Sequence, residues 1–406
     1  MFITPSSNRL HIGIFGRRNL GKSSLINAIT SQDMAIVSDV PGTTTDPVYK
    51  AMEILPIGPC MLIDTAGIDD SGELGERRVG ATRKVLRKTD VAILLFGSET
   101  GVGGFEMEMI DLFRDAGIPF IPCVTKSDIE DTRGVEEQIV SLGLLPIKVS
   151  SVTLDGIEQL KFRIIEVSPP GWSPVPLVKD LLAPGDKVVL VCPIDGAMPQ
   201  GRLILPQVQV LREVLDADSS AVVVKDSGLT KALTDLRRSP ELVITDSQVF
   251  EDVAKMVPEE VPLTSFSIIF ARHKGNLDLF VAGVEAVKGL RDGDEILIAE
   301  ACTHHVQPED IGRSKIPTWL REYTAKDLTF DIVSGGDFPA DPGKYKLVVM
   351  CGGCMVTRRE IQHRVGLCVS KSVPITNYGV LTAFMMGILG RVLEPFEENY
   401  DKSRKV

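Results

Sequence analysis

The residues of this chain that are best suited to chemistry begin with a glycine-rich loop. The segment from Gly16 to Ser23 reads G-R-R-N-L-G-K-S, which matches the phosphate-binding pattern G-x-x-x-x-G-K-[ST]. An apolar run at 10–15 precedes the loop and a helical pattern follows from Ser24, so the strand–loop–helix order that such a loop needs is present. In this arrangement Lys22 reaches the β- and γ-phosphates of a nucleotide, and the Ser23 hydroxyl binds Mg²⁺. A chance glycine-rich turn would not need both flanking elements.

Three further polar motifs each follow an apolar run that predicts a buried strand. They are D-T-A-G at 64–67, T-K-S-D at 125–128 and the serine pair at 150–151. Parallel strands bring their carboxyl ends to one edge of a sheet, which is where α/β sheets bind ligands. Asp64 can hold Mg²⁺ through water, and the Gly67 N–H can meet a γ-phosphate. A carboxylate at Asp128 can accept two hydrogen bonds from guanine, whereas adenine offers no such pair of donors, so the motifs together predict GTP binding.

The order of these motifs resembles that of the GTPase branch containing the bacterial tRNA-modification and Era GTPases. The resemblance also covers the loop P-G-T-T-T-D at 41–46. It implies GTP contacts from Gly16, Asn19, Leu20, Gly21, Lys22, Ser23, Ser24, Thr44, Asp64, Gly67, Thr125, Lys126, Asp128, Ser150 and Ser151. It further implies Mg²⁺ ligation by Ser23, Thr44 and Asp64, and catalysis by Lys22, Thr44 and Asn19.

Four positions qualify this resemblance. The fourth motif usually begins with Asn and here begins with Thr125, and the fifth usually reads S-A but here has Ser151, so guanine binding is expected to be looser. Ile68 stands where Ras-like enzymes place a Gln that orients the attacking water, which predicts slow turnover or the use of another element. Asn19 occupies the loop position that binds K⁺ in the resembling tRNA-modification GTPases, so hydrolysis is expected to be stimulated by K⁺. The alternative is that Asn19 only braces the loop.

Two cysteine groups follow apolar strands in the last third of the chain. Cys302-Thr303-His304 follows a strand predicted at 295–299, and Cys351-Gly352-Gly353-Cys354 follows one at 346–350. If these strands are neighbours in a parallel sheet, three thiolates converge at one edge. Three sulfurs and the imidazole of His304 would suit a tetrahedral zinc, and three thiolates would suit an iron–sulfur cluster one ligand short of its usual four. A plain buried C-x-x-C is the third alternative, and four other cysteines in apolar runs are expected in the core: Cys60, Cys123, Cys192 and Cys368.

Length, net charge and the distribution of apolar residues indicate a multidomain protein that binds neither nucleic acid nor membranes. A chain of 406 residues holds two or three domains. The net charge of −11 argues against a nucleic-acid partner, because phosphate backbones select basic surfaces. The first residues lack the pattern of a signal peptide, and the uncharged stretch 373–390 contains proline and glycines and is expected to be a buried helix, so a cytoplasmic protein without membrane contact is expected.

Proline-rich segments and αβ patterning divide the chain. The expected parts are a GTPase domain at 1–167, a proline-rich linker at 168–176, a middle αβ domain at 177–262 and a last αβ domain at 263–406. The middle part shows strand patterns at 187–191, 221–224 and 242–245 but no catalytic constellation, which favours a spacer or a dimerisation surface.

The full set of features resembles the HydF family of [FeFe]-hydrogenase maturation GTPases. The resemblance covers the whole chain and includes the segments 201–207 and 375–379. It implies an α/β protein with a P-loop GTPase domain, a small αβ dimerisation domain and a Rossmann-like αβ domain that binds a [4Fe-4S] cluster through Cys302, Cys351 and Cys354. The family's second motif has a His before its first cysteine, but here Met350 stands there. The candidates for a fourth ligand are then His304, Glu300, water or an exogenous ligand.

The same resemblance implies the biological role. It implies a homodimeric scaffold or carrier for the diiron subcluster of hydrogenase, with two radical-SAM maturases and the apo-[FeFe]-hydrogenase as partners. The expected cofactors are GTP, Mg²⁺, K⁺ and the [4Fe-4S] cluster. Two readings from other classes stay open: an RNA- or ribosome-associated GTPase with a structural zinc domain, and a redox enzyme that uses Cys351 and Cys354 as a dithiol.

Overall fold

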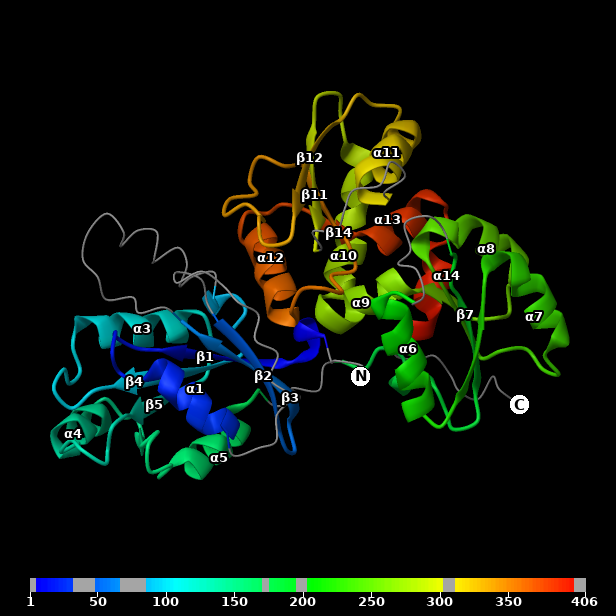
Figure 1. The fold of residues 1–406 in the computed structure, drawn as a ribbon. Coiled ribbons are helices and arrows are strands. Elements are labelled where there is room, and N and C mark those ends of the chain that lie inside the picture. Colours follow the sequence, from blue (N-terminus) through cyan, green and yellow to red (C-terminus); the bar gives the residue numbers. More distant parts are fainter. Residues whose placement is uncertain are drawn as a thin grey trace. The chain divides into compact units, whose positions relative to one another are not determined.

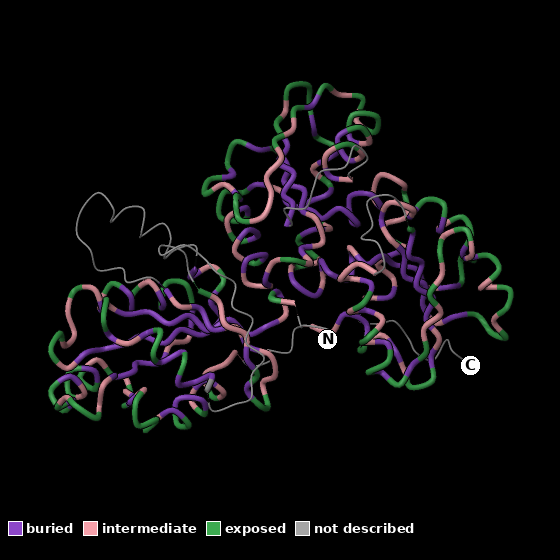
Figure 2. Tube along the Cα trace, in the orientation of Figure 1, coloured by how far each residue is buried: buried purple, intermediate pink, exposed green. Residues whose placement is uncertain are grey.

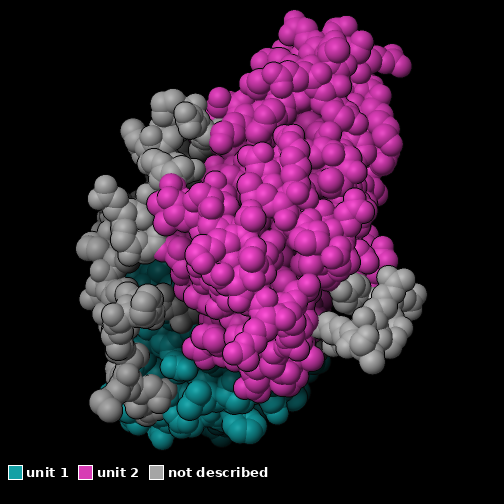
Figure 3. Space-filling view, turned by 90° about the vertical axis from the view of Figure 1, so that its right-hand side faces the viewer, with its two compact units in different colours: residues 1–172 teal, residues 173–406 magenta. Residues whose placement is uncertain are grey.

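The computed structural model describes residues 5–31, 48–65, 85–169, 175–194, 203–301 and 311–397. The chain divides into two compact units, residues 1–172 and 173–406, which are coloured separately in Figure 3. Every sheet in the described residues is built from parallel strands with helices between them, apart from one antiparallel strand pair in the first unit. The predicted α/β class is therefore confirmed.

The described part of the first unit is a six-stranded sheet in the order β2-β3-β1-β4-β5-β6 (Figure 1). Its strands are β1 (Leu10–Phe15), β2 (Val48–Ile54), β3 (Gly58–Asp64), β4 (Val91–Phe96), β5 (Phe120–Val124) and β6 (Ile147–Lys148). Its helices are α1 (Lys22–Ser31), α3 (Gly104–Asp115), α4 (Arg133–Ser141) and α5 (Ile157–Val167). Strand β2 pairs antiparallel with β3, and the other pairs are parallel.

The central strands are buried along their whole length, and apart from His11 they are apolar, because helices cover both faces of the sheet. All residues of β1 and β4 are buried, as the continuous purple trace in Figure 2 shows. One hydrophobic cluster joins the sheet to α1 and α5, and a second joins its other face to α3 and α4. Strands that are buried on both faces are expected to be nearly continuous apolar runs, and such runs were the basis for predicting these strands from the sequence.

The described part of the second unit contains two four-stranded parallel sheets, in the orders β10-β9-β7-β8 and β12-β11-β13-β14 (Figure 1). The strands are β7 (Lys187–Val191), β8 (Ser220–Val224), β9 (Leu242–Thr245), β10 (Leu263–Ser265), β11 (Glu295–Glu300), β12 (Thr329–Ser334), β13 (Leu347–Met350) and β14 (Ile375–Asn377). The helices are α6 (Leu205–Asp216), α7 (Leu229–Asp235), α8 (Phe250–Met256), α9 (Phe266–Lys274), α10 (Leu277–Val284), α11 (Ile316–Thr324), α12 (Arg358–Ser370), α13 (Tyr378–Met385) and α14 (Leu389–Leu393).

Helix α9 connects the two sheets of this unit. It begins directly after β10, the edge strand that extends the first of the two sheets past residue 262, and its N-cap Ser265 accepts a hydrogen bond from the Ile268 N–H. It also packs against α12 and α13, which belong to the second sheet. A single hydrophobic cluster includes residues from both sheets, which explains why 173–406 forms one compact unit.

Helix α10 is followed directly by a 3₁₀ helix, Glu285–Gly289. One segment differs from the helix that the sequence predicts. The uncharged stretch at 373–390 forms strand β14 before helix α13, because the side chain of Asn377 accepts the Gly379 N–H and starts a new helix there. Among the described helices, none is long and apolar enough to cross a bilayer.

Candidate functional site

The glycine-rich loop has the shape that its sequence predicts. It leaves β1 at Gly16, where an added Cβ would lie 2.8 Å from the Leu95 Cβ, so only glycine allows the close approach to the neighbouring strand. Asn19 has a φ of 64° and Gly21 a φ of 84°, values that these residue types tolerate. Lys22 is 8% exposed and its Nζ donates to the Gly16 carbonyl at 2.8 Å. The loop is therefore folded around the lysine that is predicted to reach phosphate.

Two of the three predicted Mg²⁺ ligands lie together at the carboxyl edge of the sheet. The Ser23 hydroxyl, in the first turn of α1, donates to Asp64 Oδ2 at 2.5 Å at the end of β3. The following residue, Thr65, donates its hydroxyl to the Ile14 carbonyl at 2.6 Å, which ties the end of β3 to β1. Hydroxyl and carboxylate oxygens suit Mg²⁺, so these two residues fit the ion. The predicted contacts Thr44 and Gly67 lie outside the described residues.

The predicted guanine contacts lie at the ends of β5 and β6, on the same edge. Lys126 adopts a φ of 57°, and the Asp128 side chain is exposed, as a base-binding carboxylate has to be. The buried Ser150 hydroxyl accepts hydrogen bonds from the Val152 and Thr153 N–H groups, at 3.2 and 3.0 Å, and so shapes the last loop. Thr125, which stands where related GTPases usually have Asn, is 4% exposed. Its hydroxyl is buried and has no hydrogen-bond partner among the described residues.

An ion pair that the sequence did not reveal braces the phosphate loop. Arg17 Nε lies 2.7 Å from Glu106 Oε1, and Arg17 Nη2 lies 2.9 Å from Oε2. Glu106 is fully buried in the first turn of α3 and also accepts the Gly103 N–H at 2.9 Å. The pair joins residues that are 89 positions apart, so no local pattern could have indicated it.

The strands that precede the two cysteine groups are neighbours, which meets the condition for their cysteines to lie at one edge of the sheet. Strands β11 and β13 run parallel, with Ala299 opposite Met350. Beyond them the Cys351 N–H donates to the Ala299 carbonyl at 3.1 Å, and the Cys351 Sγ accepts the Ala301 N–H at 3.0 Å. Cys302 comes directly after Ala301 in the sequence, although Cys302 and His304 lie outside the described residues. The described part of the chain thus brings Cys351 next to the residue that precedes Cys302.

The Cys351–Cys354 loop turns sharply at Gly353, which has a φ of 67°. An added Cβ there would lie 2.7 Å from the Ile361 Cδ1, so the turn requires glycine. Burial raises the pKa of the Cys351 thiol, and it raises the pKa of Cys354 to about 11. Both thiols are therefore protonated near neutral pH until a metal displaces their protons. Two sulfur donors in a tight, partly buried turn fit an iron–sulfur or zinc site, although no group of three metal-binding side chains is assembled within the described residues.

The structure describes one of the two side chains predicted as a fourth ligand, Glu300, and also Met350, which replaces the family's histidine. Glu300, at the end of β11, is 6% exposed, and its Oε2 accepts hydrogen bonds from Arg313 Nε at 3.2 Å and from the Ser334 hydroxyl at 3.1 Å. Its carboxylate is thus engaged by other side chains in this structure. Met350 is 2% exposed and lies in the core.

The four cysteines predicted to be core residues, Cys60, Cys123, Cys192 and Cys368, are all buried.

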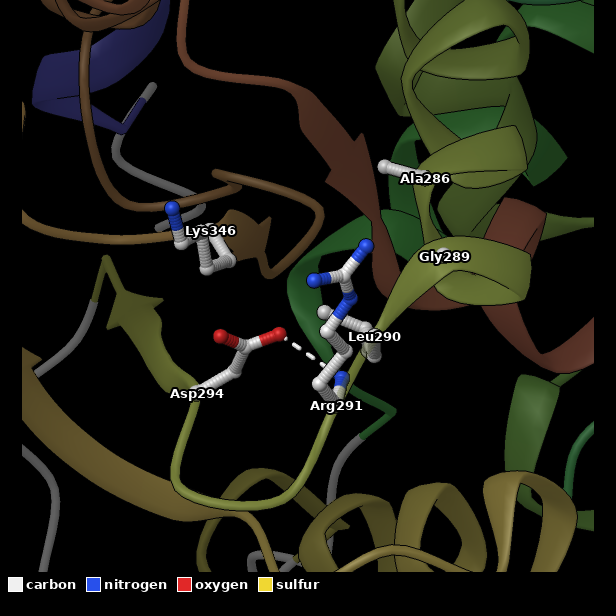
Figure 4. Close-up of a pocket in the computed structure, with 6 residues that line it drawn as sticks. All are labelled: Ala286, Gly289, Leu290, Arg291, Asp294 and Lys346. Carbon is white, nitrogen blue, oxygen red and sulfur yellow. Dashed lines mark hydrogen bonds between the residues drawn. The ribbon is translucent and has the colours of Figure 1, made fainter.

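A cavity at the other end of the same sheet is distinct from this site. Its lining comes from the loop before β11 and the residue before β13, where Arg291, Asp294 and Lys346 lie together (Figure 4). The Asp294 carboxylate accepts the Arg291 N–H at 2.8 Å. The cavity contains no sulfur or imidazole, so the cysteine edge of the sheet is the better candidate for metal chemistry.

Comparison with known proteins identifies the family. Residues 177–275 match the Hydrogen maturase F dimerization domain, and residues 278–395 match the Hydrogen maturase F tetramerization domain. Together these matches cover more than half of the 406 residues. The chain belongs to the hydrogen maturase F family. Residues 11–126 match a GTPase domain described as 50S ribosome-binding GTPase, so this family member carries a GTPase domain ahead of its two oligomerisation domains.

Individual curated relatives match less than half of the chain. GTPase Der of Bartonella quintana is 32% identical over 161 residues, which are 39% of this chain and 33% of the relative. The tRNA modification GTPase MnmE of Heliobacterium modesticaldum is 38% identical over 151 residues, 36% of this chain and 32% of the relative. The chain thus spans about a third of the length of these curated relatives. A solved structure of the G domain of the T. maritima FeoB iron transporter is 25% identical, covers 39% of this chain and 98% of that one, and has a TM-score of 0.31.

Proposed function

We propose that this chain is a GTP-hydrolysing scaffold that binds a [4Fe-4S] cluster and assembles or delivers the diiron subcluster of [FeFe]-hydrogenase. The observation that carries the proposal is the combination of a GTPase domain with both hydrogen maturase F domains in one chain. The position of Cys351 beside Ala301, at the edge where Cys302 follows, supports the cluster. The partners would be the apo-hydrogenase and two radical-SAM maturases, and the assembly would be at least a homodimer.

The GTPase domain would bind the nucleotide across the carboxyl edge of its sheet. Lys22 would exchange the Gly16 and Arg17 carbonyls, at 2.8 and 2.7 Å, for phosphate oxygens. Ser23 and Asp64 would separate to admit Mg²⁺, with Thr44 as a further ligand, and Asp128 would select guanine. No glutamine follows the D-T-A-G motif, so hydrolysis would be slow and would depend on K⁺ held by Asn19.

The K⁺ proposal is tested by comparing GTP turnover in KCl and in NaCl. Because Asn19 has a φ of 64°, an alanine there would strain the loop. Asn19→Gly is the cleaner variant, because glycine adopts this backbone conformation readily and removes the side chain with its carboxamide. We expect wild-type protein to turn over faster in KCl and the variant to lose that difference. Equal rates of the wild-type protein in both salts would refute a role for K⁺.

The last domain would hold the cluster through Cys302, Cys351 and Cys354, with His304 or Glu300 as the candidate fourth ligand. A cluster with three protein thiolates supplies an iron position at which ligands can exchange. The chain's own contribution is to present its sulfurs from two adjacent strand ends. For Glu300 to serve, it would have to leave its contacts with Arg313 and Ser334.

Cluster binding is tested by metal analysis after anaerobic reconstitution of the full chain. We expect about four irons per chain in the wild type and a strong loss in Cys351→Ser and in Cys354→Ser. Cys368→Ser is the matched control, because this cysteine is buried in the same unit but lies in α12 away from the strand ends. One tightly bound zinc and no iron would overturn the proposal and favour the GTPase with a structural zinc domain.

A further inference from the structure

One lysine in the second unit is buried against the cysteine loop. Lys274, the last residue of α9, is 2% exposed. Its Nζ donates to three backbone carbonyls of the loop: Gly353 at 3.0 Å, Cys354 at 3.2 Å and Val356 at 2.8 Å. A neutral amine has two N–H bonds and an ammonium has three, so a set of three acceptors matches the charged form. The loop that follows Cys351 is thus wrapped around a buried positive charge.

The face of α9 that contains Lys274 is built around this loop. Ser267, Phe270 and Lys274 are spaced i, i+3 and i+7, so they lie on one side of the helix. A Cβ added to Gly352 would lie 3.7 Å from the Phe270 Cβ and 3.9 Å from the Ser267 Cα, so the loop rests on that face. The Lys274 Nζ lies 5.7 Å from the centre of the Phe270 ring, a distance typical of a cation–π contact.

The lysine and the cysteines come from different domains of the family. The dimerisation match ends at residue 275, whereas the tetramerisation match begins at 278 and contains both Cys351 and Cys354. Helix α9 follows β10 of the first sheet, and Cys354 packs against the hydrophobic cluster that contains Phe270. The cysteine loop is therefore supported by the domain that precedes its own.

The buried charge of Lys274 has no carboxylate to balance it among its hydrogen-bond partners in the described residues. The other buried cation near Cys351, Arg364 in α12, is paired with Glu360 Oε1 at 3.0 Å. A buried cation without an acidic partner is costly, and thiolates at Cys351 and Cys354 would compensate it.

We propose that Lys274 is a positioning residue of the cluster site, which fixes the Cys351–Cys354 loop and, as a fixed positive charge, raises the reduction potential of the bound cluster. The inference rests on the proposed cluster binding. A cation stabilises the more negative, reduced cluster relative to the oxidised one, and the effect is large where water is excluded. The dimerisation domain therefore contributes directly to the chemistry of the cluster.

The experiment compares wild-type protein with Lys274→Met, which removes the charge and keeps an unbranched side chain. Lys274→Arg keeps a charge at this position, and Lys255→Met is the matched control, because Lys255 is exposed and pairs with Glu251 on α8. Full-length proteins are reconstituted anaerobically. Iron content, the circular dichroism spectrum and the midpoint potential from a mediated dithionite titration followed by EPR are then measured.

We expect the Lys274→Met cluster to be harder to reduce, with about a tenfold lower ratio of reduced to oxidised cluster at a fixed potential, or 59 mV for a one-electron couple. Lys255→Met should leave this ratio unchanged, and Lys274→Arg should leave it closer to the wild-type value. A folded Lys274→Met protein that holds no iron would also support the positioning role. If that variant does not fold, Lys274→Gln, which keeps a donor without the charge, replaces it.

Two failures are distinguishable. If wild-type protein takes up no cluster, the proposed function fails. If wild-type protein is loaded and the Lys274→Met or Lys274→Gln protein has the same iron content and the same midpoint potential, cluster binding stands and the role of Lys274 is refuted.

Discussion

Removal of the Arg17 side chain should destabilise the GTPase domain more than a usual surface substitution. Glu106 is fully buried, whereas Arg17 is 28% exposed. Arg17→Ala therefore leaves a carboxylate in the protein interior whose remaining hydrogen-bond donor, among the described residues, is the Gly103 N–H. Breaking a buried ion pair from one side costs about 3–5 kcal/mol. Because water can approach through the space left by Arg17, we expect about 3 kcal/mol, the lower end of that range. The loss includes the contact of the guanidinium with the Phe105 ring, whose centre is 5.5 Å away.

The assay is hydrogen–deuterium exchange of the amides of β1 and α3 in the full chain, which reports the local opening free energy without separating the two units. Arg163→Ala is the matched control. Arg163 lies 2.7 Å from Glu166, the same distance as in the buried pair, but both of these side chains are solvent-exposed. An exposed pair is worth about 0.5 kcal/mol. Equal effects of Arg17→Ala and Arg163→Ala would refute the reasoning, as would a wild-type free energy in Arg17→Ala.

Two other predictions follow from buried polar groups in the same unit. Burial lowers the pKa of His11 to about 4, so between about pH 6.5 and pH 4 the unfolded chain binds a proton that the folded chain does not, and stability falls as the pH falls. We expect His11 to account for about 2 kcal/mol of lost stability between pH 7 and pH 5. Urea unfolding should show a smaller loss in His11→Asn, and an identical loss would contradict this. Thr125→Asn should raise the affinity for GDP about fivefold, which corresponds to roughly one hydrogen bond. The reason is that the Asn carboxamide would replace the Thr125 hydroxyl, which is buried and has no hydrogen-bond partner among the described residues. Fluorescence titration with a labelled guanine nucleotide measures this, and an unchanged or weaker affinity in a folded variant would contradict it.

Several central strands could be predicted from the sequence. Those predicted at 10–15, 187–191 and 242–245 have these bounds in the structure, because each is a short, largely apolar run that is buried on both faces. The sequence also indicated a strand before each of the two cysteine groups, but it did not determine whether these strands are neighbours. The structure pairs β11 with β13 in parallel.

Elements at the edges of the sheets were missed. Strand β2 runs antiparallel at one edge with a mixed burial pattern, and β12 lies at an edge with no fully buried residue. Their side chains are partly in water, so neither a continuous apolar run nor a strict alternation marked them. Short strands such as β10 lack the length for any pattern.

The polar contacts that stabilise the candidate sites could not be predicted from the sequence either. Nothing local distinguishes Lys274 from the neighbouring basic residues Arg272 and His273, yet Lys274 is buried on carbonyls that lie about 80 positions away. Arg17 is an unspecified position of the phosphate-loop pattern, and its partner Glu106 belongs to a distant helix. Such pairs depend on how separate elements pack, which a single sequence does not record.

The most direct test of the central claim is the EPR spectrum of anaerobically reconstituted, dithionite-reduced protein. The account predicts an S = 1/2 signal from a [4Fe-4S] cluster that is lost in Cys351→Ser and retained in Cys368→Ser. Protein that contains zinc and shows no such signal under the same conditions would contradict it, and the GTPase domain would then serve another purpose.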